Sequence, residues 1–308
     1  MIPPSADLIW FNGELVPWHQ AQVHVMSHAL HYGSSVFEGV RAYKTHKGVC
    51  IFKLKEHVSR LFDSAKIYQL EIPYTQAQIV QACIDSVAKN GFESAYIRPL
   101  AFIGEIGMGM RTPETSKAEV MVAAFKWEKY LGEDAKSQGV DVCVSSWNRV
   151  APNTLPASAK AGGNYLSSQL ITLEAKRNGY DEGIGLDVNG MVSEGALQNL
   201  FIVKNNVIYT PQTSSSILVG LTRDTVITLA KNLDCEVKEQ PISRESLYLA
   251  DEFFMTGTAS EIVPVRSVDG VLVGDGNRGP ITAAMQQAFF GIFEGTTPHI
   301  DEWLTPVA

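Results

Sequence analysis

Short apolar runs separated by turn residues fill much of the first half of the chain. Two such runs, 8–11 and 14–16, flank Asn12-Gly13, a dipeptide that strongly indicates a tight hairpin turn. Apolar, β-branched and aromatic residues also predict strands at 36–43, 95–102, 120–127 and 140–145. In the second half, hairpins are predicted at Asn189-Gly190 and Asn205-Asn206, and short strands around Val237, Phe253 and Val263.

Apolar residues at helical spacing mark the remaining elements. In 56–70, Val58, Leu61 and Ala65 share one helix face, because residues three or four apart are neighbours on a helix. The same spacing predicts helices at 75–89, 165–178, 222–233 and 281–293. Strands and helices do not alternate strictly, as a doubly wound parallel sheet requires. We therefore predict an α+β (mixed α/β) fold.

The length and one polar stretch suggest two domains. A chain of 308 residues is long enough for two medium domains with a substantial core. Residues 129–138 are polar and lie between two predicted strands, so they are the candidate linker. We expect a small N-terminal α/β domain at 1–130, a linker at 131–138 and a larger C-terminal domain at 139–308.

Composition narrows the class of protein. With 45% apolar and 19% charged residues, the chain is typical of soluble globular proteins. It has no apolar run long enough for a bilayer and no secretion signal at its start, so we expect no membrane association and a cytoplasmic location. The net charge of −8 without a basic cluster argues against a nucleic-acid partner. Four widely spaced cysteines predict neither disulfides nor a metal site.

Lys160 is the first candidate for chemistry. Its neighbours in Ala159-Lys160-Ala161-Gly162-Gly163 are small, so a planar group can approach the backbone closely. Such neighbours offer a lysine few polar contacts, and a desolvated ammonium loses its proton more easily. A neutral amine attacks carbonyls to form Schiff bases. A surface lysine in a glycine-containing loop is the alternative, and the local sequence alone favours it.

Three downstream features would serve a Schiff base with pyridoxal phosphate. Glu194 follows a predicted turn and has few charged neighbours, as a partner for a pyridine nitrogen needs; a solvated turn glutamate is the alternative. Thr222 opens an amphipathic helix shortly after Gly220, and backbone N–H groups at a helix start bind phosphate, although Thr222 could be a plain N-cap. The turn at Thr258 could hold an anion through its amides.

Longer stretches resemble a known family. Residues 194–201, 208–210 and 218–223 together are similar to the composite motif of class IV pyridoxal-phosphate aminotransferases. Residues 26–33, 37–39, 96–99 and 159–165 resemble bacterial branched-chain amino acid aminotransferases more narrowly. The matches run from near residue 8 to beyond residue 290. The resemblance implies the two-domain fold-type IV architecture, with a pseudo-barrel of mixed strands in the larger domain, which carries the lysine, and the active site at the domain interface.

The resemblance also implies residue roles for the cofactor pyridoxal 5'-phosphate. Lys160 would carry the Schiff base and move the substrate proton, Glu194 would pair with the pyridine nitrogen, and Tyr165 would bind the ring oxygen O3′. The phosphate would be held by Arg60, Leu218, Gly220, Leu221, Thr222 and Thr258. Arg60 is assigned by resemblance alone, since by itself it reads as a surface arginine.

For the substrates, the resemblance implies one pocket for aliphatic and acidic side chains. Its walls would be Phe37, Gly39, Trp127, Tyr130 and Tyr165, with Tyr32 and Met110 from a neighbouring subunit. Tyr96 and Arg98 would receive the γ-carboxylate of glutamate, and Thr258 and Ala259 the α-carboxylate. A structural ion pair is the alternative for Arg98. The contribution of a neighbouring subunit implies a homo-oligomer, at least a dimer, and is compatible with a hexamer of three dimers.

The implied reaction is reversible transamination of leucine, isoleucine or valine with 2-oxoglutarate, so the partners are small amino acids and 2-oxo acids. Related alternatives are a D-amino acid aminotransferase and an aminodeoxychorismate lyase; a non-catalytic cofactor-binding protein is a third.

One departure from the family pattern concerns substrate specificity. Family members usually carry Gly-Glu where this chain has Leu197-Gln198, which leaves an L-aminotransferase of broader specificity open.

Overall fold

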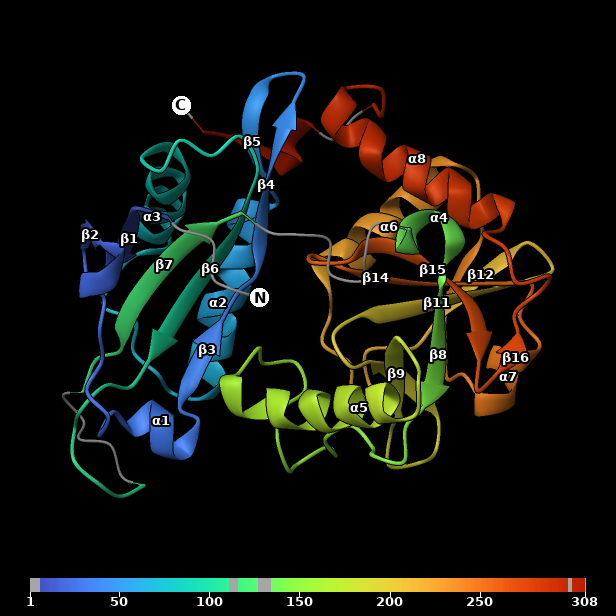
Figure 1. The fold of residues 1–308 in the computed structure, drawn as a ribbon, viewed down its shortest axis with the longest axis horizontal. Coiled ribbons are helices and arrows are strands. Elements are labelled where there is room, and N and C mark those ends of the chain that lie inside the picture. The colour runs from blue at the N-terminus through green and yellow to red at the C-terminus, as the bar shows by residue number, and fades with distance from the viewer. Residues whose placement is uncertain (1–5, 111–115, 127–133, 299–300, 308) are drawn as a thin grey trace. The chain divides into compact units, whose positions relative to one another are not determined.

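The computed structural model describes residues 6–110, 116–126, 134–298 and 301–307 (Figure 1). The chain folds into two compact units. The first comprises Met1–Trp127, Ala159–Gly163 and Phe293–Ala308, and the second comprises Glu128–Ser158 and Asn164–Ile292. Among the described helices, none combines the length and the apolar character that a membrane span requires.

The first unit is built on an antiparallel sheet of eight described strands. Their order is β17-β5-β4-β6-β7-β1-β2, and β3 pairs with β6. The strands are β1 (Leu8–Phe11), β2 (Glu14–Pro17), β3 (Ser35–Phe37), β4 (Val40–Thr45), β5 (Gly48–Phe52), β6 (Ala95–Phe102), β7 (Glu119–Phe125) and β17 (Leu304–Pro306). The predicted hairpin at Asn12-Gly13 joins β1 to β2. The described helical segments are η1 (Trp18–Gln20), α1 (His28–Tyr32), α2 (Leu54–Ile67), α3 (Gln76–Ala88) and η3 (Asp301–Trp303).

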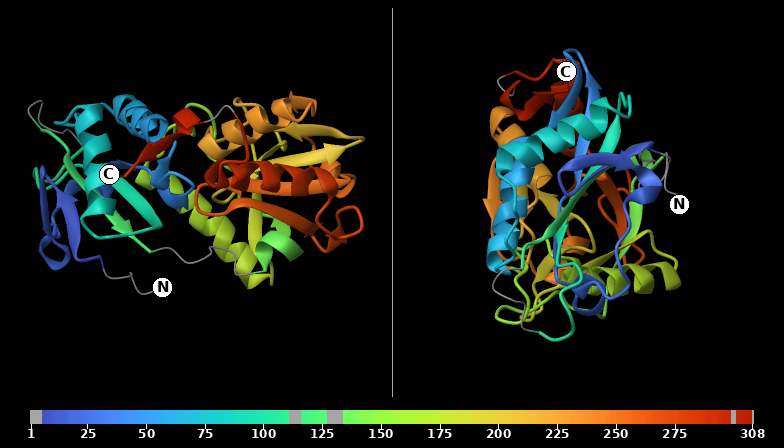
Figure 2. Two further views of the ribbon diagram at one scale, coloured as in Figure 1. Left: turned by 90° about the horizontal axis from the view of Figure 1, so that it is seen from above. Right: turned by 90° about the vertical axis from the view of Figure 1, so that its left-hand side faces the viewer.

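Helices α2 and α3 supply the core of this unit. They contact each other and strands of the sheet (Figure 2). Leu54, Leu61 and Ile79 are fully buried in one cluster with sheet residues, which confirms the apolar face predicted for 56–70. Thr75 caps α3, since its side chain accepts from Gln78 N while the Gln78 side chain accepts from Thr75 N.

The strand predicted at 36–43 is interrupted. β3 ends at Phe37 and β4 begins at Val40, and both pair with β6. Pro99 of β6 has no N–H to donate, and its carbonyl receives the Glu38 N–H at 2.8 Å. The break at residues 38 and 39 therefore lies opposite the proline of the neighbouring strand. It directs the Glu38 side chain into the interior, where it is fully buried.

The second unit contains a mixed, curved sheet of nine described strands, ordered β10-β9-β8-β15-β14-β11-β12-β13, with β16 beside β15. β8 runs parallel to both neighbours, and β12 runs parallel to β13. This half-barrel agrees with the predicted pseudo-barrel of mixed strands (Figure 1). The strands are β8 (Val140–Val144), β9 (Glu182–Leu186), β10 (Val192–Gly195), β11 (Asn199–Lys204), β12 (Val207–Thr210), β13 (Val237–Glu239), β14 (Glu252–Gly257), β15 (Glu261–Val268) and β16 (Val271–Leu272).

The helical segments of the second unit are α4 (Ala135–Gln138), η2 (Gly162–Asn164), α5 (Tyr165–Arg177), α6 (Leu221–Asn232), α7 (Arg244–Tyr248) and α8 (Pro280–Glu294), with η2 and α8 crossing the unit boundaries. The division into domains at 1–130 and 139–308 stays a prediction. The compact units differ from it in three segments, because 159–163 and 293–308 belong to the first unit and 128–138 belongs to the second. Lys160 accordingly lies in the first unit. The end of the expected linker forms α4.

Candidate functional site

Lys160 is anchored to the first unit through its backbone. Its N–H donates to Ser64 Oγ of α2 at 3.0 Å, and its carbonyl accepts from Phe37 N at 2.9 Å. A bridge between Val36 and Ala161 continues this pairing. The side chain is half-buried, and Nζ lies 5.0 Å from the centroid of the Phe37 ring. The amine is thus held beside an apolar surface and is not on an open loop.

Arg60 is fixed by a buried carboxylate. Its Nε and Nη2 donate to the two oxygens of Glu38 at 2.6 and 2.9 Å. His57, one helical turn earlier, donates Nδ1–H to Glu38 Oε2 at 2.7 Å. His57 and Arg60 therefore share one face of α2 and both point to the break between β3 and β4. The alternative of a solvated surface arginine is wrong, because only 14% of the Arg60 side chain is exposed.

The charges of this cluster follow from its burial and pairing. Burial alone would raise the pKa of Glu38, but the Arg60 charge and the His57 contact together hold that pKa well below its usual range. Burial lowers the pKa of His57, and its contact with Glu38 opposes this only in part. His57 is therefore neutral at physiological pH, and the cluster consists of one ion pair with a neutral imidazole.

Gly39, Tyr96 and Arg98 meet on the same sheet. A Cβ on Gly39 would lie 1.9 Å from Tyr96 Oη, so only glycine permits this position of the tyrosine ring. Arg98 Nη2 donates to Tyr96 Oη at 3.3 Å, and the guanidinium carbon lies 4.6 Å from the Phe37 ring centroid. Arg98 Nε is buried and has no hydrogen-bond partner within the described residues. Arg98 has no described carboxylate partner, so the alternative of a structural ion pair receives no support.

Glu194 of β10 is buried among donors in the second unit. Its Oε1 accepts from Arg149 Nη2 at 2.6 Å, and its Oε2 accepts from Asn199 Nδ2 at 3.0 Å and from Leu218 N at 3.1 Å. The Arg149 guanidinium is itself held by Ser168 Oγ at 2.9 Å. Only 5% of Glu194 is exposed, so the alternative of a solvated turn glutamate is wrong.

Asn199 connects Glu194 to the start of α6. Its Nδ2 also donates to Leu218 O at 2.9 Å, and its Oδ1 accepts from Gly220 N at 3.1 Å. A Cβ on Gly220 would lie 2.1 Å from that Oδ1, so the approach requires glycine. Gly220 is the N-cap, and α6 begins at Leu221. Thr222 is therefore not the N-cap. The first N–H groups of α6 have no acceptor within the helix.

Thr258 and Ala259 lie in the tight turn between β14 and β15. Gly257 pairs with Glu261 across this turn, as the Gly/Thr pattern suggested. Glu261, the first residue of β15, adopts a left-handed backbone with φ of 62°. Tyr165 is the first residue of α5 and is half-buried.

The remaining predicted residues divide into two groups. Tyr32 and Met110 of the first unit are exposed, to 38% and 77%. Trp127 and Tyr130 lie outside the described residues.

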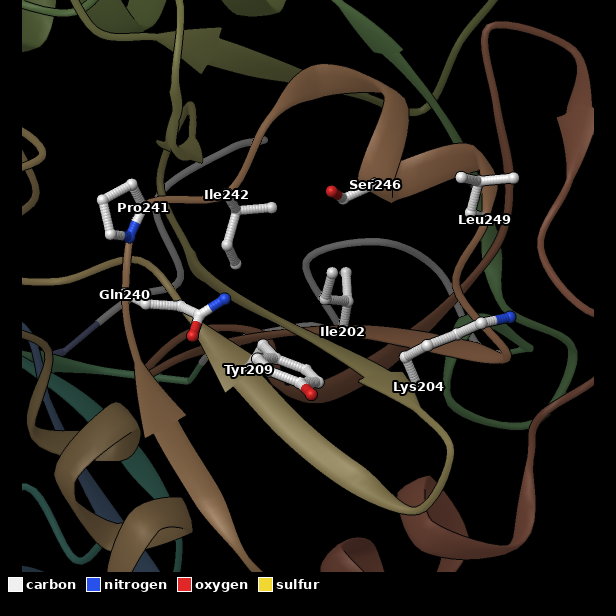
Figure 3. A pocket seen from close by; sticks show the side chains of 8 residues that line it. All are labelled: Ile202, Lys204, Tyr209, Gln240, Pro241, Ile242, Ser246 and Leu249. Carbon is white, nitrogen blue, oxygen red and sulfur yellow. The ribbon is translucent and has the colours of Figure 1, made fainter.

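A pocket of about 280 Å³ in the second unit contains none of the predicted residues (Figure 3). It is lined by Ile202, Lys204, Tyr209, Gln240, Pro241, Ile242, Ser246 and Leu249.

Sequence reasoning missed the partners of the predicted residues. Glu38 lies within 37–39, one of the stretches that carry the resemblance, and the spacing of His57 and Arg60 on one helix face was available as a signal. Arg149 carried no signal, because it lies 45 residues from Glu194 along the chain and meets it only through the fold.

Comparison with known proteins agrees with this picture. Residues 35–268 match the family amino-transferase class IV. The branched-chain-amino-acid aminotransferase of Salmonella typhimurium is 59% identical over 307 residues, which is 100% of this chain and 99% of that protein. The crystal structure of the Escherichia coli branched-chain amino acid aminotransferase is 58% identical, with a TM-score of 0.98, and the match covers 99% of this chain and 100% of that one.

A further solved structure contains the cofactor. The branched-chain amino acid aminotransferase from Thermobaculum terrenum, solved in its PLP-form (holo-form), is 34% identical, with a TM-score of 0.90 over 100% of this chain and 100% of that one. The family match spans more than half of the chain, and the similarity to these relatives extends over essentially all of it. This chain therefore belongs to the class IV aminotransferase family.

Proposed function

We propose that this protein catalyses reversible transamination between branched-chain L-amino acids and 2-oxoglutarate. One observation supports this most directly: Lys160 Nζ and the Arg98 guanidinium both lie against the Phe37 ring, with 5.0 and 4.6 Å to its centroid. An amine and a guanidinium, a carboxylate receptor, thus both pack against the same aromatic side chain.

This arrangement suits both substrates of the reaction. An aliphatic side chain gains roughly 0.8 kcal/mol per methylene that it buries against such an aromatic side chain. The γ-carboxylate of glutamate or 2-oxoglutarate would bind the Arg98 guanidinium, which Tyr96 Oη holds through Nη2. The amides of Thr258 and Ala259 would hold the α-carboxylate that both substrates share. The name of the Salmonella typhimurium relative supports the same substrate class.

The residues present fit pyridoxal phosphate. The Lys160 amine would hold its aldehyde, and the buried Glu194, oriented by Arg149 and Asn199, suits a pyridine nitrogen that must stay protonated. Tyr165 would hydrogen-bond O3′. The start of α6, capped by a glycine without a side-chain acceptor, suits a phosphate. Leu218, Leu221, Thr222 and Thr258 would complete that phosphate site together with Arg60.

The chain's own residues would provide the proton transfer and the positioning of the groups involved. When bound, pyridoxal phosphate supplies an electron sink for the substrate α carbon. Lys160 would move the proton at that carbon, because a neutral amine acts as a general base. Glu194 keeps the proton on the pyridine nitrogen. Arg149 and Asn199 fix the Glu194 carboxylate in one orientation and so act as positioning residues.

We also propose a dimer as the minimal assembly and the cytoplasm as the location. Exposed apolar residues gather near the start of the chain, with Val25 and Leu30 exposed to 73% and 64%. A neighbouring apolar pocket of about 320 Å³ includes Leu30 and Phe102. Tyr32 and Met110, exposed in one chain, would contribute to the site of a second copy. Sedimentation of the protein and of Leu30→Glu tests this, and a monomeric parent would contradict it.

Half-reaction spectra test the function. The holoenzyme is mixed with single amino acids, and loss of the absorption of the aldehyde form of the cofactor is followed. Leucine, isoleucine, valine and glutamate are each expected to bleach it, and D-alanine is not. Response to D-alanine alone would favour the D-amino acid enzyme, and no response would favour a binding protein. Borohydride reduction and mass spectrometry should place the pyridoxyl group on Lys160.

A further inference from the structure

The two residues that depart from the family pattern, Leu197 and Gln198, have different surroundings. Leu197 is 41% exposed, whereas Gln198 is only 3% exposed. Both belong to the turn between β10 and β11, which Gly195 N closes by donating to Gln198 O at 2.7 Å. The two substitutions are therefore expected to act in different ways.

Gln198 packs against the turn that carries Thr258 and Ala259. A Cβ on Gly257 would lie 3.5 Å from Gln198 Cγ and 3.4 Å from Leu197 O. Gly257 is the last residue of β14 and immediately precedes Thr258. The buried side chain of Gln198 therefore packs against the start of the turn that carries Thr258 and Ala259.

Several buried polar groups accompany this contact. Both polar atoms of Gln198, Glu182 Oε2 and Ser260 Oγ are buried, and none meets hydrogen-bond geometry with another described residue. Glu182 Oε1 accepts from Gly183 N at 2.9 Å. The Gln198 amide lies near enough to Glu182 to lower the pKa of its carboxyl, although burial outweighs this and raises that pKa to about 7. Buried polar groups of this kind serve either structure or function.

We propose that Gln198 is a positioning residue for the substrate-carboxylate turn, because its buried side chain packs against Gly257, the residue that precedes Thr258. The proposal rests on the proposed role of Thr258 and Ala259 in binding the substrate α-carboxylate. Gln198 touches neither substrate nor cofactor in this scheme. It sets the position of the two amides that do.

An amide suits this position better than the carboxyl group usual in the family. A glutamine offers both a donor and an acceptor, so it can face Glu182 whether that carboxyl is protonated or ionised. Two carboxyl groups can face each other only while they share a proton. Gln198 therefore makes the support of the turn independent of pH, and a glutamate there would make it dependent on pH.

Two variants test the proposal on the holoenzyme. Gln198→Ala removes the Cγ that packs against Gly257. It is expected to raise KM for leucine and for glutamate by the same factor, about tenfold, with kcat within about twofold, because both substrates use the α-carboxylate. Gln198→Glu is expected to match the parent at pH about 6 and to lose affinity for both substrates as the pH rises to about 9.

A readout without cofactor or substrate accompanies the kinetics. Hydrogen exchange of the peptide containing Thr258 and Ala259 in the apoprotein should be faster in Gln198→Ala than in the parent. If Gln198→Ala does not fold, the pH profile of Gln198→Glu decides alone.

Unchanged KM values with unchanged exchange, or a Gln198→Glu profile parallel to the parent's, would overturn the proposal. A higher KM for leucine but not for glutamate would also overturn the proposal, since that would place Gln198 at the side-chain pocket. Leu197→Gly provides the matched comparison from the same turn, because it is expected to leave the glutamate KM unchanged. A parent protein that transaminates neither substrate refutes the proposed function instead, so the two failures are distinguishable.

Discussion

Glu182 gives the protein a measurable pH dependence of stability. It is 1% exposed on β9, and burial raises the pKa of its carboxyl from 4.5 to about 7, while the Gly183 N–H and the Gln198 amide only partly oppose this shift. In the unfolded chain, the same group ionises near its ordinary value. Replacing it by glutamine keeps the shape and removes the titration, so the variant isolates the contribution of this one carboxyl.

The direction in which the free energy of unfolding changes with pH follows from proton binding. Between pH 4.5 and about 7, the folded state keeps a proton on Glu182 that the unfolded state has released. The stability that this proton contributes is fully present below pH 4.5 and is lost as the pH rises through about 7. A pKa that rises from 4.5 to about 7 corresponds to a total change of roughly 3 kcal/mol in the free energy of unfolding.

Denaturant unfolding of the parent and of Glu182→Gln measures this directly. Both proteins are unfolded at several values between about pH 5 and 8, at one protein concentration, because assembly would stabilise them in a concentration-dependent way. The free energy of unfolding of the parent should fall relative to that of the variant as the pH rises. Two curves that stay parallel over this range would refute a buried, proton-binding Glu182. An infrared carboxyl band that is lost in the variant gives an independent check.

The remaining predictions concern the first unit. Lys160→Ala should lose turnover with leucine even where cofactor still binds, because the substrate proton then lacks its carrier; measurable kcat near that of the parent would contradict this. Arg98→Ala should lower kcat/KM for glutamate by roughly 10- to 100-fold, since a hydrogen bond to a charged group contributes roughly 1.5–3 kcal/mol. It should lower kcat/KM for leucine far less. Equal losses would show a structural role. Gly39→Ala should lower the free energy of unfolding by roughly 1–3 kcal/mol through overpacking against Tyr96, and adding Tyr96→Phe should restore part of it.

Local patterns predicted elements where the pattern itself is long and periodic. The helices predicted at 75–89 and 165–178 correspond to α3 and α5, and the strand at 95–102 is β6. β5 was not predicted, because its apolar run has no alternation that separates a strand from a buried helix. β17 pairs with β5 from about 250 residues away, and nothing near either segment encodes that pairing. Such long-range strand pairs depend on the whole fold.

The site shows the same limit at the level of single side chains. A motif points to the residues proposed to carry a function, here Glu194 and Lys160, because the chemistry restricts the residue type. It does not identify the groups that hold them. Glu38 lies 22 residues from Arg60, and Arg149 lies 45 residues from Glu194, so each pair forms only when strands and helices have packed.

Asn199 shows why these supporting residues belong to the function. Its Nδ2 donates to Glu194 Oε2 and to Leu218 O, and its Oδ1 accepts from Gly220 N. The position of the carboxylate and the start of α6 are therefore coupled through one side chain. A shift of either one would leave a buried polar group without its partner, which costs roughly 1–3 kcal/mol. The proposed pyridine-nitrogen partner and the proposed phosphate site are thus held at a fixed separation, as a rigid cofactor with both groups requires.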